Sequence, residues 1–193
     1  DAEVRAYVTV LLLVTALVTV MLLARGVYDD FPGAVRHAAF QVVSVATTTG
    51  YSTTDYLTWP TFVPTLMLFL GCFVSCAGST GGGIKMVRML VLVRLAQREL
   101  LRILHPRVVH PVTLGGARIA NDVVANVMAF MLIYGGVMVA LTMTLLASGL
   151  DVVTAFSAVI ANVNNIGPGM GRIGPTGNYA SFTDFQLALC ALA

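Results

Sequence analysis

Two short uncharged runs contain the residues best suited to hold a cation. Residues 46–51 (ATTTGY) and residues 164–169 (NNIGPG) combine small polar side chains with glycine. Glycine lets the neighbouring carbonyls turn toward one axis, and a ring of backbone carbonyls replaces the water shell of a dehydrated cation. We therefore predict that these two turns bind a monovalent cation. The predicted site residues are Thr48, Thr49, Gly50, Tyr51, Asn165, Ile166 and Gly167.

A glycine-rich run followed by a lysine forms a third motif. Four glycines occur within six residues, and each costs a helix about 1 kcal/mol relative to alanine. The run therefore predicts that a helix opens into a loop here. Consecutive glycines with few packed side chains also predict a hinge of low local stability. The loop consists of Gly78, Ser79, Thr80, Gly81, Gly82, Gly83 and, beyond Ile84, Lys85.

The same glycine-rich loop has a competing interpretation as a phosphate-binding loop. Gly78 and Gly83 have the spacing of such a motif, but Ile84-Lys85 follows where Gly-Lys-Ser/Thr is required, and no strand precedes it. A nucleotide-binding scaffold or membrane enzyme remains the alternative from a different functional class. Cys72 and Cys76 are four residues apart, yet the absence of His or carboxylate neighbours favours packed thiols over a metal site.

The composition identifies a membrane protein. Of the 193 residues, 58% are hydrophobic and 10% charged, against about 25% charged in soluble globular proteins. The formal net charge of +2 is too small to indicate a nucleic-acid partner. The three cysteines are odd in number and lie in apolar stretches, so they indicate no disulfide framework.

Two long apolar segments are predicted to cross the membrane. Nineteen uncharged residues lie between Arg5 and Arg25, and residues 123–150 form an uncharged run of 28. A helix needs about 20 apolar residues to cross the ~30 Å hydrocarbon layer. Both segments are therefore long enough to span.

Two shorter apolar segments, residues 34–46 and 152–162, end directly before the two uncharged turns. Helices of this length reach only about 18 Å, so we predict that they enter the bilayer and stop, with the negative ends of their dipoles toward its centre. Asp151 is expected to cap the second one. Gly50 and Gly167 lie 117 residues apart, which indicates an internal repeat of long helix, half helix, turn and returning helix.

The returning segment of the first repeat is interrupted, and its second part is basic. Residues 61–77 are expected to be helical as far as the glycine-rich loop, and residues 84–104 to form a further helix. The positive-inside rule makes this end cytoplasmic, with residues 85–118 inside and the turn entrances outside. The basic stretch fits an ordinary topogenic flank and a docking surface for a regulator equally well. Six of the eleven basic residues lie here: Lys85, Arg88, Arg94, Arg98, Arg102 and Arg107.

The remaining segments connect the two repeats and complete the second. Residues 105–116 contain two His-Pro pairs and a Gly-Gly, so they are expected to form a short linker in which His105 and His110 are solvated. After a Gly/Pro-rich return, a further helix is expected to start at Thr183. The first residue is not methionine and this helix is short, so we interpret the chain as a fragment.

These motifs resemble a known transporter family. Residues 48–51 (TTGY) resemble one repeat of the potassium-channel filter signature Thr-Val-Gly-Tyr-Gly, and residues 165–169 resemble a diverged copy. Residues 76–85 (CAGSTGGGIK), followed by the basic helix and His105-Pro106, are similar to the bacterial TrkH branch of the Trk/Ktr/HKT superfamily. The resemblance covers nearly all of the chain and matches the third and fourth of the family's four helix–pore-helix–helix repeats.

The resemblance implies an all-α integral membrane fold containing two of the expected four repeats. The expected organisation is a third repeat with a broken inner helix over residues 1–104, a cytoplasmic linker over 105–117, and a fourth repeat over 118–193, truncated in its last helix. The first two repeats are missing, as is the arginine that the family carries in the last helix beneath the filter.

The resemblance also implies a function. The expected activity is potassium uptake across the bacterial cytoplasmic membrane, with potassium ion at the filter residues, no organic cofactor and no enzymatic step. The glycine-rich loop is expected to act as the gate, where Lys85 either raises an electrostatic barrier or anchors the loop. The expected partners are the lipid bilayer, a second copy in a homodimer, and a cytosolic nucleotide-binding ring of the TrkA type; no nucleic acid is expected.

Two further features of the transport remain open at this stage. Transport is expected to be channel-like or weakly coupled, because no intramembrane carboxylate or histidine relay for protons is visible in the sequence. Within the same superfamily, a sodium-permeable transporter is the alternative, and the missing first filter would discriminate, since serine in place of its glycine favours sodium in this family.

Overall fold

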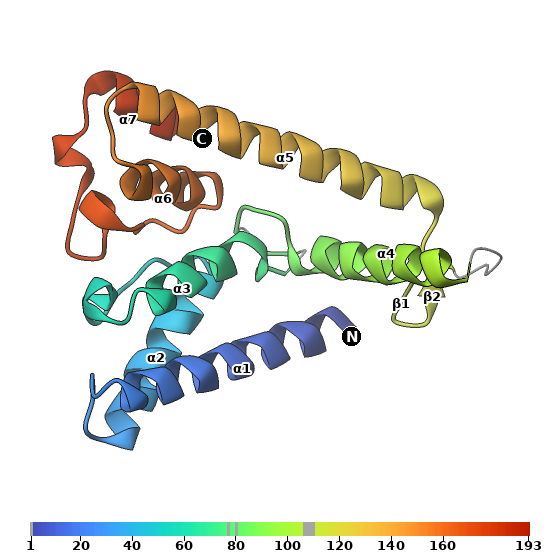
Figure 1. Cartoon of the computed structure of the whole chain (residues 1–193), viewed down its shortest axis with the longest axis horizontal. Coiled ribbons are helices and arrows are strands. Elements are labelled where there is room, and N and C mark those ends of the chain that lie inside the picture. Colours follow the sequence, from blue (N-terminus) through green and yellow to red (C-terminus); the bar gives the residue numbers. More distant parts are fainter. Residues whose placement is uncertain (1, 77, 80, 106–110) are drawn as a thin grey trace.

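The computed structural model is almost entirely helical, and it describes residues 2–76, 78–79, 81–105 and 111–193. Seven α-helices follow one another, interrupted by one short hairpin and three single 3-10 turns (Figure 1). The α-helices are α1 (Ala2–Ala24), α2 (Phe31–Ala46), α3 (Phe62–Phe73), α4 (Met86–Leu104), α5 (Asn121–Ala147), α6 (Val152–Val163) and α7 (Asp184–Leu192). The 3-10 turns are η1 (Tyr56–Thr58), η2 (Gly171–Ile173) and η3 (Tyr179–Ser181), and the strands are β1 (Thr113–Leu114) and β2 (Ala117–Arg118).

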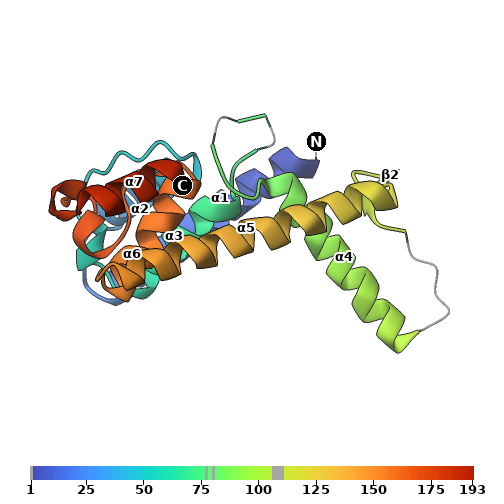
Figure 2. The same ribbon diagram turned by 90° about the horizontal axis from the view of Figure 1, so that it is seen from above.

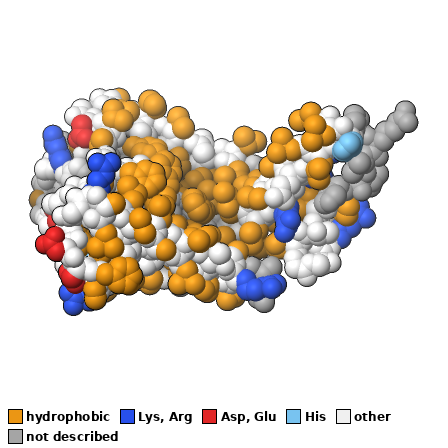
Figure 3. All heavy atoms as spheres, turned by 60° about the horizontal axis from the view of Figure 1, so that its bottom comes forward, with side chains coloured by type: hydrophobic (Ala, Val, Ile, Leu, Met, Phe, Trp, Pro, Cys, Tyr) orange, Lys and Arg blue, Asp and Glu red, His pale blue; other side chains and the backbone are white. Residues whose placement is uncertain are grey.

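Within the described part of the chain, two helices are long and apolar enough to cross a membrane, namely α1 and α5. Many of their large apolar side chains lie outside the core: Leu12 of α1 is 66% exposed and Leu132 of α5 is 78% exposed. On the face in Figure 3, a broad hydrophobic band separates charged side chains near the two ends of the molecule. Apolar surface of this extent is stable in contact with lipid or with further apolar protein, because water would be excluded from it.

The two half helices, α2 and α6, begin in the same way. The amide of Gly33 donates to the Asp30 carboxylate at 2.7 Å, and the amide of Thr154 donates to the Asp151 carboxylate at 3.0 Å. The predicted Asp151 cap is therefore confirmed. Because Asp30 caps α2 and Pro32 fits its first turn, α2 begins at residue 31 rather than the expected 34. Its 16 residues reach about 24 Å, still less than the hydrocarbon layer.

The helix that returns from the first turn ends earlier than expected. We expected it to run to residue 77, but α3 ends at Phe73. The amide of Ile84 donates to the Cys72 carbonyl at 2.8 Å, and that of Met86 donates to the Ser75 carbonyl at 2.7 Å. The returning chain thus uses carbonyls that a further helical turn would need. The helix therefore breaks after Phe73, and α4 begins at Met86 instead of the expected residue 84.

The segment between α4 and α5 contains a small hairpin that the sequence reasoning did not anticipate. Thr113 pairs with Arg118 and Leu114 with Ala117 in antiparallel register. Gly115 and Gly116 both have positive φ, at 59° and 88°, which is the requirement of a two-residue turn that matches strand twist. His105 is exposed as expected, whereas Arg107 and His110 lie outside the described residues.

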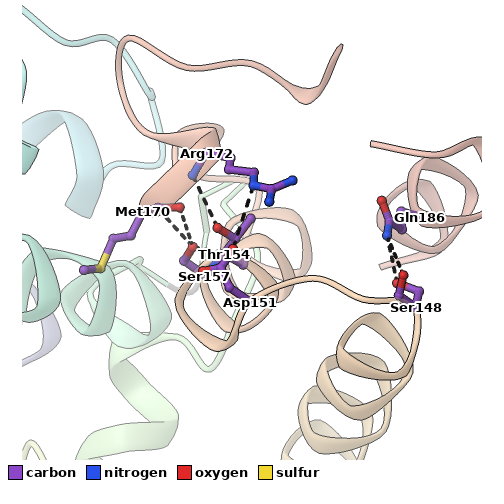
Figure 4. Close-up of polar contacts among 7 residues, drawn as sticks. All are labelled: Ser148, Asp151, Thr154, Ser157, Met170, Arg172 and Gln186. Carbon is purple, nitrogen blue, oxygen red and sulfur yellow. Dashed lines mark hydrogen bonds and ion pairs between the residues drawn. The ribbon is translucent and has the colours of Figure 1, made fainter. Parts of the chain in front are cut away.

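The last helix starts where the sequence predicted. Thr183 and Gln186 form a reciprocal capping box at the start of α7. The side-chain amide of Gln186 also donates to the Ser148 carbonyl at 3.2 Å and hydroxyl at 2.9 Å (Figure 4). These bonds fix α7 against the end of α5, and they enclose the cluster of buried side chains around α6.

Candidate functional site

The two uncharged turns have the same backbone conformation. Thr48 and Asn165, which are 117 residues apart, both have left-handed φ values, 54° and 56°. Gly50 and Gly167, also 117 residues apart, have φ values of 77° and 97°. The residue between each pair lies outside the left-handed region, so left-handed and ordinary residues alternate in both turns. A threonine in this region is strained, and such strain persists only where the surroundings enforce it.

The hydrogen bonds that close the two turns are also equivalent. In each turn, the first left-handed residue donates to the carbonyl three residues earlier, and the next residue donates to the carbonyl five residues earlier. These bonds are Thr48 to Val45 at 3.1 Å, Asn165 to Asn162 at 3.1 Å, Thr49 to Ser44 at 2.8 Å and Ile166 to Ala161 at 2.8 Å. The internal repeat seen in the sequence is therefore a repeat of backbone geometry.

The two turns lie directly against each other. A Cβ atom on Gly50 would overlap the carbonyl oxygen of Ile166 and would lie 3.3 Å from Cδ of Pro168. A Cβ atom on Gly167 would lie 3.9 Å from Cα of Gly50. Only glycine permits this approach at position 50, because any side chain would meet backbone that cannot move away.

Most carbonyls in these turns, including the six at the predicted cation-binding positions, receive no hydrogen bond from any described residue. By contrast, the Tyr51 carbonyl accepts a bond from the Ser44 hydroxyl at 2.6 Å, and its side chain is 74% exposed. Except for Ile166, the residues that carry these carbonyls are exposed or half-buried in this chain, so the carbonyls are open to a cation or to water. The six carbonyls belong to Thr48, Thr49, Gly50, Asn165, Ile166 and Gly167.

Polar side chains on the half helix α2 hold the first turn in place. The Gln41 amide is fully buried and donates to the Ser52 hydroxyl at 2.7 Å and the Thr54 carbonyl at 3.3 Å. Ser44 lies one turn further along the same helix and bonds to Tyr51. We did not single out either residue in the sequence. Their signal was available, because Gln41 and Ser44 are polar residues three positions apart in residues 38–46, which are otherwise apolar.

Polar side chains of α6 hold the chain that follows the second turn (Figure 4). The Ser157 hydroxyl accepts from the Met170 amide at 2.9 Å and lies 3.1 Å from the Met170 carbonyl. The Thr154 hydroxyl accepts from the Arg172 amide at 3.3 Å. Tyr56, from the first repeat, donates to the Gly169 carbonyl at 3.0 Å, so each repeat supports the other.

Asp151 connects the outer end of α6 to the chain that leaves the second turn. Its carboxylate lies 4.0 Å from Nε of Arg172, and both side chains are more than half exposed, so this ion pair contributes little. The pKa of Asp151 is lowered mainly because the Thr154 amide donates to the carboxylate, with smaller effects from the Thr154 hydroxyl and Arg172. The ionised form of Asp151 therefore stabilises the start of α6.

The glycine-rich loop packs against the beginning of both turns. A Cβ atom on Gly81 would lie 2.9 Å from the Thr48 hydroxyl oxygen. A Cβ atom on Gly82 would lie 2.6 Å from the Val163 carbonyl oxygen, and the Gly82 amide donates to the Asn164 carbonyl at 3.2 Å. Gly78 and Ser79 are exposed, and Thr80 lies outside the described residues. The loop thus contacts the turns through the glycines that follow Thr80.

Lys85 folds back over the loop. Its ammonium group donates to the Ser79 carbonyl at 2.7 Å and also contacts the Gly81 carbonyl. Of the two roles expected for Lys85, this geometry corresponds to anchoring the loop. The amides of Gly82, Ile84 and Met86 all donate to protein carbonyls, and a phosphate-binding loop would require such amides to be free.

The basic helix α4 leaves the loop and diverges from α5 toward its far end (Figure 2). Close to the loop the two helices are joined, because the Arg88 guanidinium lies 3.9 Å from the centre of the Phe130 ring. Further along, Arg98 and Arg102 share the carboxylate of Glu99 at 2.8 Å and 3.5 Å. The far end of α4 is therefore a charged surface with a net positive balance.

Comparison with known proteins agrees with this geometry. The sequence model of TrkH, described as a cation transport protein, matches residues 4–192. The chain belongs to the TrkH family. It is 41% identical over 173 residues to the Trk system potassium uptake protein TrkH of Vibrio parahaemolyticus, covering 90% of this chain and 36% of that protein. It is 37% identical over 181 residues to TrkH of Salmonella typhimurium, covering 94% of this chain and 37% of that protein.

The same family appears among solved structures. The crystal structure of the potassium transporter TrkH from Vibrio parahaemolyticus matches with a TM-score of 0.92 at 38% identity, covering 98% of this chain and 40% of that one. The resemblance and the fold class predicted from the sequence are thereby confirmed: the chain has the all-α fold of an integral membrane transporter family and contains two helix–pore-helix–helix repeats. It spans less than half the length of these relatives.

Proposed function

We propose that this chain supplies two of the pore-lining repeats of a potassium uptake protein in the bacterial cytoplasmic membrane. The two uncharged turns line the ion path as two segments of the selectivity filter. Their carbonyl oxygens take the place of the potassium ion's water shell. Relatives that share 37–41% of the sequence are named as Trk system potassium uptake proteins, and this supports the choice of ion.

The observation that carries the proposal is the cluster of six carbonyls without described hydrogen-bond donors. They occupy matching positions in two turns that touch at Gly50 and Ile166. Main-chain carbonyls at fixed positions favour an ion that sheds water readily, and the alternating left-handed residues turn successive carbonyls toward one side. Tyr51 belongs to the filter as a supporting residue, because its carbonyl is already bonded to Ser44.

We further propose that the glycine-rich loop, with Lys85 as its anchor, is the gate. The loop lies against Thr48 and Asn164 at the start of both turns, on the side from which α4 departs. An ion leaving the filter toward that side meets the loop first. Displacing the loop requires breaking the Gly82–Asn164 hydrogen bond and the bonds from the Ser75 hydroxyl to the Gly82 carbonyl and from the Ile84 amide to the Cys72 carbonyl, while the Lys85 contacts hold the loop itself together.

The assembly follows from the family. We propose residues 1–104 and 118–193 as the third and fourth repeats, and residues 105–117 as the cytoplasmic linker. Residues 85–118 face the cytoplasm and the filter entrances face outward. The intact protein forms a homodimer in the lipid bilayer, and a TrkA-type nucleotide-binding ring regulates it through the basic cytoplasmic face that carries Arg94, Arg98 and Arg102.

The test is cation uptake into liposomes by the full-length protein that contains this chain. Gly50→Ser is compared with Gly26→Ser, because Gly26 also has a positive φ, 64°, but no described atom lies within 4 Å of an added Cβ. We expect rubidium uptake that resists sodium competition in the parent and in Gly26→Ser, and loss of that selectivity in Gly50→Ser. Equal selectivity in all three proteins would refute the filter assignment.

The same experiment separates the two alternatives. A sodium-permeable transporter would show sodium competition already in the parent. A nucleotide-binding scaffold would show no uptake in the parent, and ATP would protect Lys85 from chemical modification in the absence of any regulator.

A further inference from the structure

Asn164 occupies a position where four elements meet. It is fully buried at the end of α6, directly before the second turn. Its side-chain amide donates to the Ile160 carbonyl at 2.7 Å and contacts Sγ of Cys72 in α3 at 3.8 Å. Its side-chain oxygen accepts from the Tyr134 hydroxyl of α5 at 3.0 Å, and its main-chain carbonyl accepts from the Gly82 amide at 3.2 Å. One residue therefore touches the second turn, the glycine-rich loop, α3 and α5.

The equivalent position in the first repeat is different. Thr47 lies 117 residues before Asn164, and it is exposed. Among the described residues, its hydroxyl bonds to neighbours within four residues, namely the Val43 and Ser44 carbonyls and the Thr49 hydroxyl. The repeated turn geometry therefore needs only local bonds at this position. The long-range bonds of Asn164 serve a purpose specific to the second repeat.

Two glycines of the loop, Gly82 and Gly83, pack closely against Asn164. A Cβ atom on Gly82 would lie 2.9 Å from Cα of Asn164, and one on Gly83 would overlap its side-chain oxygen. Gly83 also has a φ of 81°, which only glycine adopts freely. A change in the orientation of the Asn164 side chain would therefore displace the loop backbone directly.

Tyr134 fixes that orientation and connects it to α4. The hydroxyl of Tyr134 binds the Asn164 side-chain oxygen, and its ring stacks on Phe130 with centroids 6.0 Å apart. The Arg88 guanidinium covers the other member of this pair, Phe130, at 3.9 Å. Arg88 lies within the first turn of α4, three residues after Lys85. The contacts of Arg88 with Phe130, of Phe130 with Tyr134 and of Tyr134 with Asn164 therefore connect α4 to Asn164.

We propose that Asn164 anchors the glycine-rich loop in its closed position, and that Tyr134 is the positioning residue that holds Asn164 in the orientation the loop requires. The Arg88–Phe130 contact makes this anchor sensitive to the position of α4. This inference rests on the proposed function of the loop as a gate, and it deepens that function by naming the residues that link the gate to the filter.

The experiment uses the full-length protein without any regulator, with Cys76→Ser and Cys190→Ser so that Cys72 is the reporter thiol of this chain. Cys72 is 7% exposed, its sulfur contacts the Asn164 side chain, and its carbonyl accepts from the Ile84 amide, so a reagent reaches it only when the loop moves away. Tyr134→Phe removes the hydroxyl and keeps the stacked ring. Tyr179→Phe is the matched control, because Tyr179 is also half-buried and its hydroxyl also bonds to an asparagine of α6, but it does not bond to the loop or to Asn164 in the described structure.

We expect Tyr134→Phe to raise the modification rate of the reporter thiol about three- to fivefold, the effect of losing one hydrogen bond. Regulator-free rubidium uptake should rise by a similar factor, while Tyr179→Phe matches the parent in both measurements. Equal modification rates in the two variants would overturn the proposal, as would a loss of selectivity in Tyr134→Phe with unchanged loop accessibility. If Tyr134→Phe fails to fold, Phe130→Leu should produce a smaller increase in the same direction, and no increase would overturn the proposal.

Thiol modification does not depend on transport. If the parent shows no selective uptake, the proposed function fails, yet the two modification rates still decide whether Asn164 and Tyr134 hold the loop.

Discussion

Replacing Gly82 by alanine should release the glycine-rich loop from the filter. The added Cβ would lie 2.6 Å from the Val163 carbonyl oxygen, 2.9 Å from Cα of Asn164 and 3.0 Å from its carbonyl carbon. All three are backbone atoms of the segment that precedes the second turn, so a side-chain rotation cannot relieve the clash. The φ of Gly82 lies outside the left-handed region, so alanine adds no backbone strain of its own.

The size of the effect follows from the clash alone. Overpacking against an immobile neighbour costs about 1–3 kcal/mol. The Gly82–Asn164 hydrogen bond of 3.2 Å is lost whenever the loop opens, in the parent as in the variant, so it does not add to the difference. The closed position should therefore lose about 1–3 kcal/mol relative to the open one, which corresponds to a shift in the equilibrium of at least about fivefold.

The assay is rubidium uptake by the full-length protein in liposomes without regulator, with Gly78→Ala as the control. Gly78 belongs to the same loop, but no described atom lies within 4 Å of an added Cβ. We expect uptake to rise strongly in Gly82→Ala and to stay at the parent level in Gly78→Ala. If the two variants behave alike, contact between the loop and the second turn does not hold the gate closed, and the reasoning from this contact is wrong.

Three other changes test separate parts of the structure. Lys85→Gln should raise regulator-free uptake several-fold, because the ammonium contacts with the Ser79 and Gly81 carbonyls are charge-assisted bonds worth about 1.5–3 kcal/mol each at most; unchanged uptake would leave Lys85 without an anchoring role. Ile166→Ala should lower the free energy of unfolding by about 2–5 kcal/mol, since this side chain is 2% exposed in the core, and a thermal melt in detergent measures the loss. Because the pKa of Asp151 is lowered in the folded protein, its carboxylate stabilises the fold fully above the ordinary pKa of 3.8. This contribution to stability disappears as the pH falls through the lower pKa of the folded state. Between pH 7 and pH 3, the melting temperature should therefore fall more steeply in the parent than in Asp151→Asn.

The sequence was sufficient to find the turns and the half helices because their signals are local. Gly50 and Gly167 lie at left-handed positions, which glycine adopts without strain. The capping aspartates lie within three residues of the amides that donate to them. The length of an apolar run also decides directly whether a helix spans the bilayer. These features depend on residues that are close together in the chain, so composition and spacing alone could reveal them.

The remaining features depend on contacts between distant segments. The early end of α3 results from hydrogen bonds that residues 84 and 86 make back to Cys72 and Ser75, which no helix propensity encodes. The Tyr56–Gly169 bond joins residues 113 positions apart, and the Tyr134–Asn164 bond joins α5 to the second turn. Without knowing that the two repeats face each other, the sequence offers no reason to prefer these partners.

The two repeats also explain why the filter is hard to recognise by side-chain identity. The cation-binding groups proposed here are carbonyls, so what must be repeated is the pattern of φ angles and closing hydrogen bonds, and this pattern is the same in both turns. Side chains at matching positions are then free to differ: Thr48 corresponds to Asn165, and Tyr51 to Pro168. Since the filter needs only the backbone, the residues beside it can acquire separate tasks. Asn164 does so by contacting the gate loop, whereas the bonds of its counterpart Thr47 to described residues stay within its own turn and the end of α2.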